Sequence, residues 1–259
     1  MWDVVGAVRV RGRVNDRALA HEVAAPHAVF VHGLGMATNY LEPTMRALGE
    51  EIAVSALDLP GFGGSRPVRG HLPLAALADA LIEWMRERRV AAPILVGQSH
   101  GCQVVVEAVA RVPDVASALV LNAPTMVVDH RSISAQLWRV ALDTPREPLS
   151  LVPHVARDYL RAGPTRILAT LNDALRDRIE DKLPGVRVPV TIANGARDPV
   201  SPPAWGERLA RLTGSRSGGR GAHLVVVPGA AHAVPFSHPQ ALAAEIIAMA
   251  RQVGARIES

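Results

Sequence analysis

The sequence has 259 residues, of which 49% are hydrophobic and 20% charged, with a formal net charge of +4. This length suits one large α/β domain with an insertion. No uncharged apolar run approaches the ~18 residues that a membrane span needs, so we expect no membrane partner. The arginines are dispersed among acidic residues and Lys182 is the only lysine, so we expect no nucleic-acid partner.

The N-terminal part of the chain is typical of short strands, at residues 4–10 and around residues 17–23. Asp3 stands where an export signal carries positive charge, and arginines at 9, 11 and 13 interrupt any apolar core. Cys102 is the only cysteine, so an intramolecular disulfide is impossible. These features favour a cytoplasmic location.

Strand-like and helix-like segments then alternate. Short β-branched apolar runs predict buried strands at 27–31, 52–57, 93–96, 116–121, 189–193 and 223–227. Amphipathic segments predict helices at 39–48, 74–88, 102–111, 203–212 and 240–252. This alternation predicts an α/β fold with a mostly parallel sheet flanked by helices. Residues 213–222, rich in serine and glycine, are expected to form a surface loop.

One stretch interrupts the alternation. Between residues 126 and 185 no buried strand pattern occurs, and helices are predicted at 132–142, 151–161, 165–171 and 172–182, separated by prolines. We interpret 126–185 as a helical cap inserted into a core made of 1–125 and 186–259.

The pentapeptide Gly97-Gln98-Ser99-His100-Gly101 follows a predicted strand and precedes a predicted helix. A serine at such a sharp, strained turn needs small residues two positions to either side, because side chains there collide with the neighbouring strand or helix. In isolation the same pattern also fits a serine that caps a helix. In its context it predicts a nucleophile elbow.

A serine nucleophile needs a base and a carboxylate that orients the base. Asp198 and His232 each follow a later predicted strand, in the chain order serine, acid, histidine. Asp129 is the alternative acid, and Asp198 alternatively caps a turn before Pro199. His238 better suits the start of the last helix, and His223 opens a strand, so we favour His232.

These segments together resemble the α/β-hydrolase fold superfamily, in particular its small, capped, esterase-like serine hydrolases. The resemblance rests on His32-Gly33-Leu34-Gly35, residues 58–65, the elbow, Ala196-Arg197-Asp198-Pro199 and Gly229-Ala230-Ala231-His232. It implies an oxyanion hole made by the backbone N–H groups of Leu34 and His100. Gly33 and Gly35 would let the backbone approach the substrate.

The resemblance implies acyl transfer through Ser99, without a cofactor or metal, on a small-molecule carboxylic ester or lactone of largely apolar character. Trp138, Tyr159 and Val200 are candidates for the substrate pocket, although the helical spacing of the apolar cap residues is equally explained by packing. Two alternatives stay open: a carbon–carbon bond hydrolase of meta-cleavage products, and a ligand-binding or biosynthetic homologue without turnover. The carbon–carbon bond hydrolases have tryptophan after the catalytic histidine, where this chain has Ala233. Epoxide hydrolases and dehalogenases have aspartate as the nucleophile, where this chain has Ser99.

Overall fold

The computed structural model describes residues 1–5, 8–15, 26–49, 51–65, 68, 70–216 and 221–257. Within these residues the strands form one eight-stranded sheet of order β1-β2-β4-β3-β5-β6-β7-β8. The strands are β1 (Trp2–Val5), β2 (Val8–Val14), β3 (His27–Val31), β4 (Ala53–Asp58), β5 (Ile94–Gln98), β6 (Ala118–Asn122), β7 (Val190–Gly195) and β8 (His223–Val227). The strand predicted around residues 17–23 lies outside the described residues.

From β3 to β8 every neighbouring pair is parallel, which confirms the predicted mostly parallel sheet. At the N-terminal edge of the sheet, the prediction of one strand over residues 4–10 is wrong. The apolar run is divided between β1 and β2, which pair antiparallel with Val5 opposite Val8. The chain therefore reverses inside the predicted strand, and β2 continues to Val14, where it pairs antiparallel with β4.

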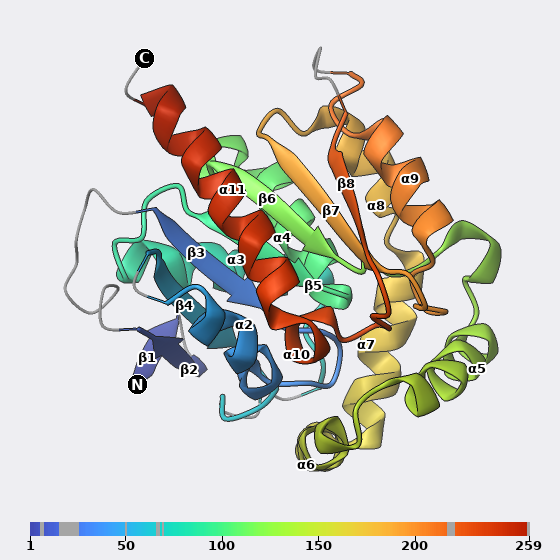
Figure 1. Cartoon of the computed structure of the whole chain (residues 1–259). Helices are drawn as coiled ribbons and strands as arrows, with labels where there is room; N and C mark the ends of the chain where they lie inside the picture. The colour runs from blue at the N-terminus through green and yellow to red at the C-terminus, as the bar shows by residue number, and fades with distance from the viewer. Residues whose placement is uncertain are drawn as a thin grey trace.

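Alternate residues of the central strands point to opposite faces, and each face is covered by helices (Figure 1). Phe30 belongs to the cluster with α2 (Glu42–Ala47) and α11 (Pro239–Ile257), whereas Val29 and Val31 belong to the cluster with α3 (Leu74–Glu87) and α4 (His100–Arg111). The covering elements are η1 (Thr38–Leu41), α2 (Glu42–Ala47), α3 (Leu74–Glu87), α4 (His100–Arg111), η2 (Pro113–Val115), α9 (Pro203–Leu212), α10 (Val234–Ser237) and α11 (Pro239–Ile257). The helix predicted at 39–48 thus starts as a 3₁₀ turn, with Pro43 at the start of α2.

Residues 126–185 are called here the helical segment. Most of it, up to residue 176, lies beyond the carboxyl ends of the central strands (Figure 1), whereas residues 179–185 pack into the core beside α4 and α9. The segment contains η3 (Val128–His130), α5 (Ile133–Asp143), η4 (Thr144–Arg146), η5 (Leu149–Leu151), α6 (Val152–Ala162), α7 (Pro164–Arg176), α8 (Ile179–Lys182) and η6 (Leu183–Gly185). The predicted break between Leu171 and Asn172 is wrong. Leu171 and Ala174 bury the same helical face beside Met126, so packing continues α7 through Asn172.

No helix in the described part of the chain is long and apolar enough to cross a membrane. The loop predicted at 213–222 connects α9 to β8, and its residues 217–220 lie outside the described residues.

Candidate active site

Ser99 sits at a strained backbone turn between β5 and α4, with φ 56° and ψ −120°. A Cβ atom on Gly97 would lie 2.7 Å from the Cα of Cys102, and one on Gly101 would lie 2.3 Å from the carbonyl oxygen of Val31. Real Cβ atoms do not approach backbone so closely, so both positions require glycine. The strained serine and its two flanking glycines are the features that the elbow pattern predicts.

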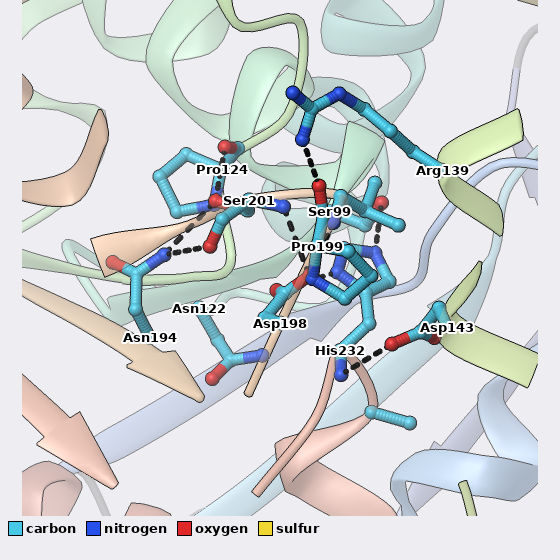
Figure 2. Close-up of polar contacts among 12 residues, drawn as sticks. Ser99, Asn122, Pro124, Arg139, Asp143, Asn194, Asp198, Pro199, Ser201 and His232 are labelled. Atoms are coloured by element: carbon cyan, nitrogen blue, oxygen red, sulfur yellow. Dashed lines mark hydrogen bonds and ion pairs between the residues drawn. The ribbon is translucent and has the colours of Figure 1, made fainter. Parts of the chain in front are cut away.

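The structure brings Ser99, His232 and Asp198 together from three strand ends (Figure 2). His232 Nε2 lies 2.9 Å from Ser99 Oγ, and His232 Nδ1 lies 2.8 Å from Asp198 Oδ2. A neutral imidazole that donates its Nδ1–H to the carboxylate presents an Nε2 lone pair to the serine hydroxyl. The geometry therefore suits proton transfer from Ser99 to His232.

The Asp198 carboxylate is held by its own loop. Its Oδ1 accepts the N–H groups of Val200 at 2.7 Å and Ser201 at 2.9 Å, which leaves Oδ2 for the histidine. Asn194 at the end of β7 donates to both the carbonyl and the hydroxyl of Ser201, and that hydroxyl donates to the carbonyl of Pro124 (Figure 2). The loop that carries the acid is thus bonded to the segment after β6.

Charge around His232 favours its protonated form. Burial opposes the imidazolium, but the charge and hydrogen bond of Asp198, together with the charges of Asp143 and Glu147, outweigh burial and raise the pKa of His232 to about 9. A histidine in this setting accepts a proton readily.

The turn after β3 passes against the nucleophile. A Cβ atom on Gly33 would lie 3.2 Å from the Cβ of Ser99. His32 Nε2 accepts the N–H of Leu59 at 2.9 Å, so the ring proton is on Nδ1, which donates to the Gly33 carbonyl at 2.8 Å. The N–H of Gly33 donates to the hydroxyl of Tyr40 at 2.9 Å. These bonds fix the turn that presents Leu34.

The backbone N–H groups of Leu34 and His100 have no acceptor among the described residues, which leaves both available for a substrate oxygen. The side chain of His100 is buried, and its Nδ1 lies 3.0 Å from Oε1 of Gln103. The ring is therefore engaged within the core and is not free to bind a substrate oxygen. Burial lowers the pKa of His100, so the ring is neutral and donates its Nδ1–H to that oxygen.

The pocket residues predicted from the sequence differ in their surroundings. Tyr159 packs on the turn after β3, because a Cβ atom on Gly35 would lie 2.9 Å from its ring. Val200 is buried beside Asp198, whereas Trp138 on α5 is 65% exposed. Their contacts with a substrate stay predictions.

The alternative residues lie elsewhere. Asp129 is exposed in η3, His238 contacts Ser237 at the start of α11, and His223 pairs with Glu245 at 3.6 Å. Among the described residues no group of three or more His, Cys, Asp or Glu side chains is placed to hold a metal ion.

Sequence reasoning did not identify three polar residues near the site: Tyr40, Asp143 and Glu147. Asp143 and Glu147 accept hydrogen bonds from the backbone beside His232. Their spacing of four residues at the end of a predicted helix gives no sign of this contact, because it depends on how the helical segment meets the core.

Several known proteins resemble this chain in sequence or in fold. The profile of the alpha/beta hydrolase family matches residues 28–245. A pimeloyl-[acyl-carrier protein] methyl ester esterase of Neisseria meningitidis serogroup B (strain ATCC BAA-335 / MC58) is 31% identical over 249 residues, covering 85% of this chain and 91% of that protein. A dihydrolipoyllysine-residue acetyltransferase component of the acetoin cleaving system of Cupriavidus necator is 29% identical over 222 residues, covering 84% of this chain and 55% of that protein.

Two solved structures share the fold. A thermophilic esterase from Thermogutta terrifontis superposes with a TM-score of 0.78 at 20% identity, covering 98% of this chain and 97% of its own. The enol-lactonase from Burkholderia xenovorans LB400 superposes with a TM-score of 0.76 at 19% identity, covering 96% of this chain and 99% of its own.

Proposed function

The chain belongs to the alpha/beta hydrolase family, and we propose that it is a serine hydrolase that cleaves a carboxylic ester through an acyl-enzyme on Ser99. The observation that carries the proposal is the continuous hydrogen-bonded path from Ser99 through His232 to Asp198. A serine hydroxyl alone is a poor nucleophile, and this path supplies both the base and its orienting carboxylate.

In the proposed reaction Ser99 Oγ attacks the ester carbonyl while its proton passes to His232 Nε2. Asp198 stabilises the imidazolium that forms. Collapse of the tetrahedral intermediate breaks the bond to the alcohol, which leaves with the proton from His232. Water then attacks the acyl-enzyme by the same route and releases the acid, so that Ser99 and His232 return to their starting states.

The negative oxygen of the tetrahedral intermediate would be bound by the N–H groups of Leu34 and His100. The proposal is supported by the availability of both groups, and by the bonds of His32 and Tyr40 that hold the turn in place. Such donors act because they are already oriented when the charge develops.

We propose that the helical segment is a cap that selects the substrate. The Neisseria relatives act, by their name, on a methyl ester of a pimeloyl chain carried by acyl-carrier protein. By analogy we propose for this chain a methyl ester at the end of an apolar acyl chain. The contact of Tyr159 with Gly35 supports a cap that reaches the oxyanion turn.

The proposal is tested by comparing turnover of aliphatic methyl esters of increasing chain length, an aryl ester, a lactone and a yellow dienoate. We expect turnover of the methyl and aryl esters, its loss in Ser99→Ala, and its retention in Ser150→Ala, which removes an exposed serine of η5. Turnover of the dienoate alone would favour carbon–carbon cleavage. A folded wild type that turns over none of them would favour a binding protein.

A further inference from the structure

Two carboxylates of the helical segment contact the loop that carries His232. Asp143, the last residue of α5, accepts the backbone N–H of His232 at 3.3 Å (Figure 2). Glu147, just after η4, accepts the N–H of Ala233 at 2.6 Å through its Oε1. Two consecutive N–H groups beside the histidine are therefore bound by side chains more than eighty residues earlier in the chain.

Both carboxylates are placed where ionisation is costly. Asp143 is 7% exposed, and Oε2 of Glu147 is buried without a hydrogen-bond partner. Among the described residues neither carboxylate forms an ion pair with Lys or Arg. When both are ionised, a buried and a half-buried acid side by side without a cationic partner lower stability unless a positive charge forms beside them.

The group that can supply this positive charge is His232. Asp198 faces His232 from the loop after β7, and Asp143 and Glu147 face it from the helical segment. Arg139 of α5 lies nearby, but its guanidinium donates to the carbonyl of Pro199. Burial raises the pKa of Asp143 to about 7 and raises that of Glu147, and the charge of His232 opposes both shifts.

We propose that Asp143 and Glu147 are positioning residues, a carboxylate clamp that holds the His232 loop against Ser99 and stabilises the imidazolium formed when Ser99 loses its proton. This inference rests on the proposed triad. The hydrogen bonds fix the backbone at 232 and 233, and the negative charges favour the protonated ring. The proton itself moves only from Ser99 Oγ to His232 Nε2.

The two parts of the clamp are separable by substitution. Asp143→Asn and Glu147→Gln keep an oxygen that accepts the backbone N–H but remove the charge. Asp143→Ala and Glu147→Ala remove both. Asp173→Ala is the matched control, because Asp173 also joins the helical segment to the core, by accepting the N–H of Leu74 at 2.8 Å, but does so at α3.

The readouts are the rate of Ser99 phosphonylation by a fluorophosphonate, kcat and KM for an aryl ester, and the pH profile of kcat/KM. We expect each alanine variant to lose about tenfold or more in phosphonylation rate and kcat, with KM little changed, because a displaced base acts on the chemical step. The Asn and Gln variants should recover much of this rate, with the acidic limb of the profile shifted to lower pH. Asp173→Ala should keep the wild-type rates and limb.

The outcomes separate the clamp from the triad. A wild type whose Ser99 is not labelled would overturn the proposed function, and the clamp with it. A labelled wild type whose alanine variants react at the wild-type rate, with an unchanged acidic limb, would overturn the clamp alone. If the alanine variants do not fold, as judged by circular dichroism, the acidic limbs of Asp143→Asn and Glu147→Gln decide: a shift supports the clamp and none refutes it.

Discussion

Substituting Gly101 by alanine tests whether backbone packing at the elbow sets both stability and the geometry of the site. The added Cβ would lie 2.3 Å from the carbonyl oxygen of Val31 and 2.8 Å from that of His32. Both neighbours are backbone atoms, which cannot rotate away as a side chain does. The start of α4 and the end of β3 must therefore separate by about 1 Å to restore ordinary contact.

We expect Gly101→Ala to lower the free energy of unfolding by about 1–3 kcal/mol, the usual cost of overpacking. The same displacement moves Ser99 relative to the turn at Gly33, and a misplacement of about 1 Å costs on the order of 10²-fold in rate. Urea denaturation and kcat/KM for an aryl ester measure the two effects.

The control is Gly185→Ala, because a Cβ atom there meets nothing within 4 Å. It should match the wild type in both measurements. If Gly101→Ala also matches the wild type in both measurements, backbone packing at the elbow sets neither the stability nor the geometry of the site. If the variant is destabilised but fully active, the packing contributes to stability as expected but does not determine the geometry of the site.

Two further predictions concern pH and helix stability. His232 must be neutral to accept the Ser99 proton, and its pKa is raised from 6.5 to about 9. We therefore expect kcat/KM to increase with pH along an acidic limb whose midpoint lies well above pH 6.5. A midpoint near pH 6.5 would contradict the charge environment of His232. In α11, Gly254→Ala introduces a Cβ that meets nothing within 4 Å. The gain in helix propensity should raise the free energy of unfolding, measured by urea denaturation, by about 0.5–1 kcal/mol. A lower free energy of unfolding would contradict this prediction.

The sequence was sufficient to predict the parallel part of the sheet, because buried parallel strands are short apolar runs separated by helices. It also predicted that Ser99, Asp198 and His232 lie close together, since each follows such a run and parallel strand ends meet at one edge. The hairpin of β1 and β2 was missed because one apolar run contains both strands. Local pattern does not indicate where a chain reverses within such a run.

The contacts of the helical segment could not be predicted in the same way. Asp143 and Glu147 have an ordinary helix-end spacing, and their bonds to His232 and Ala233 arise only from how α5 and η4 meet the core. Tyr40 similarly falls within a predicted helix, and its bond to Gly33 depends on the path of the turn after β3. Long-range side-chain contacts of this kind carry no sequence period.

The proposal that Ser99 is an activated nucleophile is tested directly by intact-protein mass spectrometry after treatment with a fluorophosphonate. We predict one phosphonyl group per chain, located on Ser99 by peptide mapping, absent in Ser99→Ala and formed far more slowly in His232→Ala. An unmodified, folded wild type, or a label that persists in Ser99→Ala, would contradict the proposal.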